Sequence, residues 1–366
     1  MSPGSTVTVI SPVSNSILRK IKVGFEPTGL TFSSLTGATF VANRLSNTLS
    51  RIPKSGIKTD ATIMVGAEPR GVAFDSANGN IYATNFDSGT VSVISGAKNK
   101  IVKTITVKQN PMGIVFDSLN DNLYVACGGS GNLGSDQGFT SGAGFVSVIN
   151  GATNKVVATI SVGTAPYDLV FDRDNGLIFV SNHFSNPGTV SVINGSTNTL
   201  FATVTVGGAF SEPEGIAYDS ANGDIYVANW ASGTVFVFNA TTPFGGVTTI
   251  SGFSEPTGVM FDSVNGLVYV ANSAALSVSV IAGNNNSVVK TIPSVGFELG
   301  PYEFALNPSS NKIYVTADSL SVIDGASNNV TSTISVGDFP VGVSFDSLNG
   351  MLYVDNFFSG TISIIS

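Results

Sequence analysis

Residues 212–229, EPEGIAYDSANGDIYVAN, hold a phrase that recurs along the whole chain. It returns as EPRGVAFDSANGNIYATN at 68–85 and as EPTGVMFDSVNGLVYVAN at 255–272. The units recur about every 45 residues, a length that accommodates four short strands. This self-similarity predicts a chain built from copies of one small unit. A proline marks each copy: Pro27, Pro69, Pro111, Pro166, Pro213, Pro256, Pro301 and Pro340.

Each unit divides into four predicted strands. In the second unit the first strand is GVAF (71–74) and the second is IYATN (81–85). They are joined by D-S-x-N-G, whose Asn-Gly pair is expected to supply the positive φ angles of a tight hairpin. An alternating run such as TVSVI (90–94) forms the third strand, and a polar turn leads to the fourth. Since no window has a helical period, the predicted fold class is all-β.

The units are expected to close into a β-propeller, because a single sheet cannot bury both of its faces. We predict one domain over residues 1–366, a closed ring of four-stranded blades, with eight blades as the first choice and seven as the runner-up. The chain has one more predicted third strand than eight blades need, because TVTVI (6–10) and TISII (361–365) both have the pattern of a third strand. We expect residues 17–23 to complete the last blade beside 361–365, joining the termini by strand sharing. The first TVTVI then either dangles or displaces the C-terminal copy.

The second-strand motifs resemble those of the YVTN-type β-propeller repeat proteins. The resemblance is carried by LIFVSN (177–182), DIYVAN (224–229), LVYVAN (267–272), KIYVTA (312–317) and MLYVDN (351–356), with GTVSVI-like runs after them. It covers essentially the whole chain. It implies a closed propeller of the kind found on archaeal or bacterial cell surfaces or in secreted proteins. The family has no shared catalytic residues, so the resemblance implies fold and location and no chemistry.

Composition excludes several classes of function. Charged residues make up 11% of the chain and the formal net charge is −8, so no basic patch is expected for a nucleic-acid partner. The sequence has no run of 18 apolar residues, so no transmembrane helix is predicted. Cys127 is the single cysteine, which excludes an internal disulfide and a cysteine-based zinc site. The start, MSPGSTVTVI, has no signal-peptide pattern, and we expect that a targeting segment has been removed. Four sequons at Asn194, Asn239, Asn285 and Asn329 also favour an extracellular or cell-surface location with N-glycans.

Two rings of candidate site residues follow from the propeller geometry. The first is the position after the second strand, which varies between units. If exposed, its aromatic and arginine side chains would form a contact surface for a protein or glycan; the alternative is that they cap the packing between blades. In unit order the position holds Arg44, Phe86, Gly128, His183, Trp230, Ser273, Asp318 and Phe357.

The second ring lies around the repeat proline and is acidic. Glu26, Glu68, Glu212 and Glu255 precede the proline, and Asp168, Glu214 and Glu303 follow it. Carboxylates gathered at a channel mouth could hold a divalent cation such as Ca²⁺. Alternatively they bond to backbone amides of neighbouring loops. No EF-hand-type motif favours the metal, and no other cofactor is expected.

The third unit carries an insertion at 127–145, CGGSGNLGSDQGFTSGAGF. It is expected on the same face as the two rings, where Asp136, Gln137 and Phe139 would contact a partner. A Gly/Ser-rich excursion without a function is the alternative.

Three functions remain open from the sequence. The first is a non-catalytic protein or glycan interaction module at the cell surface or in the secreted fraction. The second is a propeller enzyme, a lyase or hydrolase with its site at the channel mouth. His183, the one histidine, and a pair of carboxylates are the groups available to it. The third is a structural tile of a surface layer.

Overall fold

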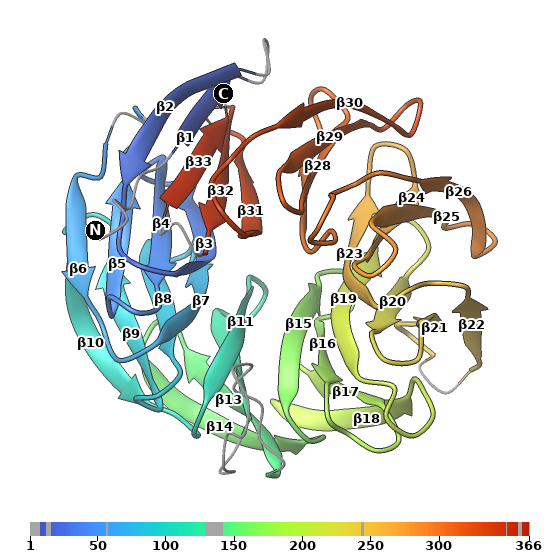
Figure 1. Cartoon of the computed structure of the whole chain (residues 1–366). Helices are drawn as coiled ribbons and strands as arrows, with labels where there is room; N and C mark the ends of the chain where they lie inside the picture. Colours follow the sequence, from blue (N-terminus) through green and yellow to red (C-terminus); the bar gives the residue numbers. More distant parts are fainter. Residues whose placement is uncertain are drawn as a thin grey trace. The chain divides into compact units, whose positions relative to one another are not determined.

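The described residues of the structure, a computed structural model, are 8–11, 16–55, 58–128, 142–242, 245–348, 350–357 and 361–365. For residues 8–11, 16–20 and 361–365 the description covers the backbone only. These residues form 33 strands, β1–β33, and no helix (Figure 1). The all-β prediction is therefore confirmed. Within this described part, no helix exists that is long and apolar enough to cross a bilayer.

The chain divides into two compact units, and the first combines Met1–Ile105 with Ser294–Ser366. It contains four sheets, antiparallel except for the contact of β1 with β33, and their first strands lie side by side in the order β27, β31, β3, β7. The β3–β6 sheet has β3 (Pro27–Ser33), β4 (Ala38–Asn43), β5 (Thr48–Ile52) and β6 (Ala61–Met64). The β7–β10 sheet has β7 (Pro69–Phe74), β8 (Asn80–Asn85), β9 (Thr90–Ser95) and β10 (Lys100–Thr106). The β27–β30 sheet has β27 (Phe304–Asn307), β28 (Lys312–Thr316), β29 (Leu320–Asp324) and β30 (Asn329–Ile334). The terminal sheet has β1 (Thr8–Ser11), β2 (Ser16–Lys22), β31 (Pro340–Asp346), β32 (Met351–Asn356) and β33 (Thr361–Ile365).

The second unit is the continuous segment Thr106–Pro293. Its four sheets also contact one another through their first strands, in the order β11, β15, β19, β23. The β11–β14 sheet has β11 (Pro111–Asp117), β12 (Asn122–Cys127), β13 (Gly144–Asn150) and β14 (Lys155–Val162). The β15–β18 sheet has β15 (Pro166–Asp172), β16 (Leu177–Asn182), β17 (Thr189–Asn194) and β18 (Thr199–Thr205). The β19–β22 sheet has β19 (Pro213–Asp219), β20 (Asp224–Asn229), β21 (Thr234–Asn239) and β22 (Val247–Ser251). The β23–β26 sheet has β23 (Pro256–Asp262), β24 (Leu267–Asn272), β25 (Ser277–Ala282) and β26 (Ser287–Ile292).

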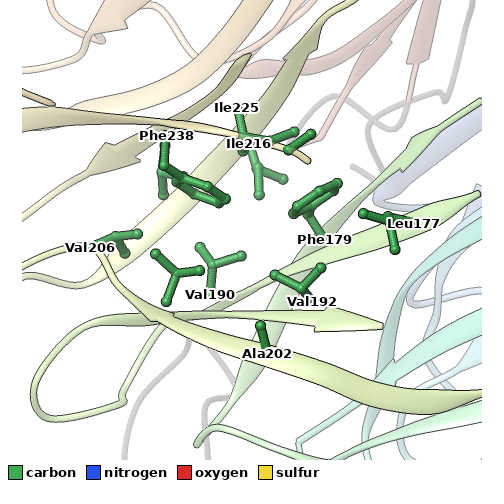
Figure 2. Packing of buried hydrophobic residues seen from close by; sticks show 12 residues of the cluster. Leu177, Phe179, Val190, Val192, Ala202, Val206, Ile216, Ile225 and Phe238 are labelled. Atoms are coloured by element: carbon green, nitrogen blue, oxygen red, sulfur yellow. The ribbon is translucent and has the colours of Figure 1, made fainter. Parts of the chain in front are cut away.

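The cores lie between neighbouring sheets. Figure 2 shows the cluster between the β15–β18 and β19–β22 sheets, where Phe179 and Phe238 place their ring centroids 5.9 Å apart. Second strands are buried on both faces, which is why they read as near-continuous apolar runs. The second-strand tyrosines are among the largest fully buried side chains: Tyr82, Tyr124, Tyr226, Tyr269, Tyr314 and Tyr353.

The hairpin between first and second strands differs from the expected tight turn. Gly79 takes the positive φ, 76°, and its N–H donates to the Asp75 carbonyl four residues back. Asn78 instead donates its side-chain amide to Asp75 Oδ2 at 2.6 Å. The Asp75 carboxylate also accepts from the Ala77 N–H at 2.8 Å. The turn is thus wider than a two-residue hairpin, because the aspartate side chain closes part of it.

The terminal sheet joins the two ends of the chain, as predicted. β2 pairs antiparallel with β33, with Ile21 opposite Ile362. Ile21 and Val23 then pack in a core with Tyr353 and with two side chains of the neighbouring sheet. The expectation for the first TVTVI run was wrong. β1 neither dangles nor displaces β33: it pairs antiparallel with β2 and parallel with the last residues of β33 (Figure 1).

Inner strands of neighbouring sheets approach closely at the position two residues after the repeat proline, where most units carry a glycine. A Cβ built on Gly215 would lie 2.3 Å from the Thr257 carbonyl oxygen of the next sheet. The same contact occurs at Gly29, 2.1 Å from the Arg70 oxygen. Asp168 occupies this position in the β15–β18 sheet. Its Oδ2 accepts from the Ile216 N–H of the next sheet at 3.4 Å.

Candidate binding face

The two predicted rings meet at one end of the sheets. We call this end of each unit, where the fourth-to-first and second-to-third connections lie, the loop face. In seven repeats the residue after the second strand donates its backbone N–H to the carbonyl of the residue before the proline. Donors are Arg44, Phe86, Gly128, His183, Trp230, Ser273 and Phe357, and acceptors are Glu26, Glu68, Asn110, Ala165, Glu212, Glu255 and Phe339, at 2.7 to 3.1 Å.

The acceptor residues of these bonds are held in an uncommon backbone conformation. All seven have φ between 47° and 55°, although none is glycine. This left-handed region disfavours side chains that carry a Cβ. The hydrogen bond from the residue after the second strand and the following proline together fix the loop there. A loop held in this way presents its side chains in one defined direction.

A buried asparagine at the end of the second strand supports the face from below. Asn85 accepts from the Gly66 N–H at 3.1 Å and donates to Thr90 Oγ1 and Ser92 Oγ, each at 3.0 Å. It therefore fixes the loop before the first strand to the start of the third. The equivalent asparagines Asn43 and Asn356 likewise accept a backbone N–H, from Gly24 and Gly337.

In the first unit, arginines neutralise the predicted acidic ring. Arg44 forms ion pairs with Glu26 at 3.3 Å and with Glu68 at 3.2 Å, and so links two sheets. Arg70 pairs with Glu68 at 3.3 Å and lies over the Phe86 ring, 4.1 Å from its centroid. Burial raises the pKa of Glu26 against the opposing effect of Arg44. These partly buried groups form a charge-paired band across two sheets.

Aromatic side chains continue this band across the two other sheets of the first unit. The Arg44 guanidinium carbon lies 5.8 Å from the Phe357 centroid. Phe357 and Phe339 are 5.9 Å apart, and Phe339 and Tyr302 are 5.7 Å apart, both in tilted geometry. Tilted pairs of this kind are favourable beyond their area burial. Arg44 and Phe357 are partly buried, so their edges border the face.

The cation prediction rests on Glu26, Glu68, Glu212 and Glu255. Two of these, Glu26 and Glu68, have arginine partners in the structure. Across the described residues, no group of three or more His, Cys, Asp and Glu side chains is placed to hold a metal ion. Ca²⁺ at this face stays a prediction, and the geometry gives it no further support.

In the second unit His183 lies beside aromatic rings. Its ring centroid is 5.8 Å from Tyr167 and 4.6 Å from Phe184. Burial lowers the pKa of His183 to about 4, so it is neutral at physiological pH. Of the two alternatives for the position after the second strand, the buried one holds for His183 and for Phe86, which are 4% and 1% exposed. Packing between sheets covers both side chains. Trp230 is partly buried.

The second unit also gathers carboxyl groups near the repeat proline. Burial raises the pKa of Asp168 to about 6. Burial, and then the charges of Glu212, Asp168 and Glu255, raise the pKa of Glu214 to about 8. Both side chains are partly buried. This unit therefore holds carboxyl groups that change charge between pH 4 and 8.

The NHL repeat, a β-propeller repeat type, matches residues 210–238. No curated protein matches. Among solved structures, the chain is similar to hydrazine synthase of Kuenenia stuttgartiensis, with a TM-score of 0.63, 16% identity, and 93% of this chain and 95% of that chain covered. It is also similar to the computationally designed Ika8 protein, with a TM-score of 0.71, 14% identity, and 99% of each chain covered.

The chain has a β-propeller fold. At these identities the likeness to solved structures concerns the fold alone. The narrower YVTN resemblance stays a prediction, as do ring closure and the count of eight blades.

Sequence reasoning missed the most exposed aromatic side chains of the propeller's loop face. Phe25 is 48% exposed, Phe210 is 71% exposed and Phe297 is 83% exposed. Each lies in the loop that leads into a first strand. They escaped notice because their distance from the proline varies, so the repeat alignment does not collect them.

Phe297 owes its position to the departure of the seventh repeat from the common pattern. Asp318, at the variable position after the second strand, accepts hydrogen bonds from the N–H groups of Phe297, Glu298 and Leu299. The bonds from Glu298 and Leu299 measure 2.9 and 2.5 Å. A carboxylate that accepts several backbone N–H groups is a strong local clamp. It holds the loop so that the Phe297 side chain is directed outward.

Several predicted residues remain to be placed. Asp136, Gln137 and Phe139, in the 127–145 insertion, lie outside the described residues. Cys127 is buried, and burial raises the pKa of its thiol to about 11. The sequon residues Asn285 and Asn329 are exposed, whereas Asn194 and Asn239 are partly buried.

Proposed function

We propose that this propeller is a non-catalytic interaction module that binds a protein or glycan partner on its loop face. The observation that carries the proposal is the exposure of Phe25, Phe210 and Phe297 on loops of one topological type. Large aromatic side chains are favoured at the hot spots of binding interfaces. The clamps at Asn85 and Asp318 support the same proposal, since a fixed loop loses little entropy when a partner binds.

The proposal includes the shape and the location of the protein. We propose that the eight sheets close into one eight-bladed ring, which would bring both parts of the loop face to one rim. A cell-surface or secreted location is supported by the low content of charged residues and by the exposed sequon residues Asn285 and Asn329. A role as a surface-layer tile would use the same location without a soluble partner.

The test uses defined probes and a matched control. Wild-type protein is screened on an array of defined glycans and an array of purified surface and secreted proteins, and the Kd of each hit is measured by biolayer interferometry. The Phe25→Ala/Phe210→Ala/Phe297→Ala variant is expected to weaken binding at least tenfold. Phe201→Ala removes a 53% exposed phenylalanine from the outer strand β18 and is expected to change nothing. Equal binding by wild type and triple variant would remove the loop face from the proposal.

A second function is favoured by one specific observation. Asp168 and Glu214, with pKa values of about 6 and about 8, are separated as general acid–base pairs are. We propose acid–base catalysis by a lyase or hydrolase as the alternative use of this face. Hydrolase and lyase substrates would be screened with wild type, Asp168→Asn and Glu214→Gln. Activity that survives both substitutions would eliminate the pair.

A further inference from the structure

A groove of about 620 Å³ lies in the first unit, between the end of β2 and the outer strand β6. Ile21, Lys22, Val23 and Gly24 line one side, and Lys58 to Thr62 line the other. Its volume is within the range of binding sites for small ligands and short peptides. The groove borders the loop that carries Phe25, because Gly24 and Ser46 line it and Ser46 Oγ accepts the Phe25 N–H at 2.6 Å. The proposed function uses the Phe25 side chain, which is not among the lining residues.

One wall of the groove includes residues of the outer strand β6. β6 pairs with β5 from Ala61 to Met64 without a shift in register, and it is the last strand of its sheet among the described residues. The outer strands β14, β18, β26 and β30 all carry a register shift, whereas β22, like β6, carries none. Such bulges and edge lysines are devices that keep edges from pairing. β6 has neither device, so the alternate N–H and C=O groups on its outer side remain available to another strand.

The groove is lined by positive charge, although the protein as a whole has a negative net charge. Lys22 and Lys58 are exposed at its margins. Asp60, the carboxylate among the described lining residues, is held by Arg51 in an ion pair and by the bond from its own N–H to the Arg51 carbonyl at 3.0 Å. The groove therefore presents two lysines in a chain of net charge −8. A ligand that carries carboxylates would complement it.

The groove walls are also fixed in position. Thr59 donates its hydroxyl to the Lys22 carbonyl across the groove. Ile21 and Val23, which alternate with Lys22, are buried in the core below. A strand entering the groove would therefore meet walls that do not need to rearrange.

The geometry points to an acidic, extended peptide as the occupant, which adds as a strand to the outer edge of β6 while its carboxylates meet Lys22 and Lys58. Main-chain hydrogen bonds to the edge would give affinity, and the two lysines would give specificity.

The test measures fluorescence anisotropy of labelled hexapeptides that alternate valine with glutamate, lysine or threonine. The glutamate peptide is expected to bind wild type with an affinity that falls as salt is raised. Lys22→Glu/Lys58→Glu should weaken that binding at least tenfold. Lys155→Glu, a charge reversal on the outer strand β14, should leave it unchanged. Equal binding of glutamate and lysine peptides, or an equal loss with Lys155→Glu, would overturn the proposal.

Two further measurements separate strand addition from charge attraction and from self-association. Of two glutamate peptides N-methylated on opposite edges, one should lose binding and the other should keep it, because only one edge faces β6. Equal binding of both methylated peptides would overturn strand addition. In sedimentation experiments, the protein alone should not form a dimer that depends on Lys22 and Lys58. Such a dimer would assign the groove to a second copy of the chain and would overturn the peptide.

Discussion

At the scale of single residues, Asp168 and Glu214 make the stability of the propeller depend on pH. Burial raises the pKa of Asp168 from 3.8 to about 6 and, with neighbouring carboxylates, that of Glu214 from 4.5 to about 8. The folded state therefore binds more protons than the unfolded state in these windows. The free energy of unfolding must fall as pH rises from about 4 to about 8.

We predict that Asp168→Asn/Glu214→Gln flattens this fall. Melting temperature is measured at intervals from pH 4 to pH 8, and the slope is the readout, since either substitution can shift the absolute stability. His183 has the opposite sign: its lowered pKa, about 4, makes stability rise between pH 4 and pH 6.5. His183→Gln should therefore steepen the net fall with pH. An unchanged slope in the acid double variant would contradict the assignment of these carboxyls.

Some contacts and exposures of single residues could not be predicted from the sequence. The repeat placed Arg44 and Glu26 near one another because each has a fixed position in its unit. It could not show that Arg44 reaches Glu68 of the next sheet, since that contact depends on the spacing between sheets. The same glutamates were therefore predicted as cation ligands. The exposure of Phe297 depends on the Asp318 clamp, for which the sequence holds no recognisable motif.

At the scale of elements, close backbone contact between sheets limits which residue types the inner strands can carry. Gly215 on β19 lies so close to β23 that an added methyl group would meet the Thr257 carbonyl oxygen at 2.3 Å, as well as the Gly258 Cα. Strand positions were predictable from alternation because one register buries the apolar set. The need for glycine was predictable only as a turn signal, although its real cause is this packing between strands.

We predict that Gly215→Ala destabilises the protein by about 1–3 kcal/mol through overpacking. Gly208→Ala is the matched control, because its Cβ would have nothing within 4 Å, and it should be neutral. Both are compared by chemical denaturation followed by circular dichroism. A stable Gly215→Ala protein would show that β19 and β23 can separate without cost.

At the scale of the whole molecule, the first unit is discontinuous in sequence and depends on the pairing of its two ends. The strands β2 and β33 come from residues more than 330 positions apart along the chain of 366, so loop-closure entropy opposes their pairing. That pairing was predicted from the count of strand types. The parallel contact of β1 with β33 was not, because TVTVI and TISII have the same pattern and no alternation rule distinguishes their places.

We predict that removing residues 1–15 changes the melting temperature little, whereas removing residues 1–24 lowers it strongly. The first deletion removes β1 and leaves β2, β33, β32 and β31 paired. The second also removes the buried side chains of Ile21 and Val23, whose burial is worth about 3–6 kcal/mol together. It also leaves the β33 edge unpaired. The full-length Ile21→Ala/Val23→Ala variant should reproduce most of the loss, which separates side-chain burial from strand pairing. Hydrogen exchange of the amides at 361–363 should quicken after the longer deletion alone. If both deletions melt at the same temperature, the sharing of strands between the termini does not hold the first unit together.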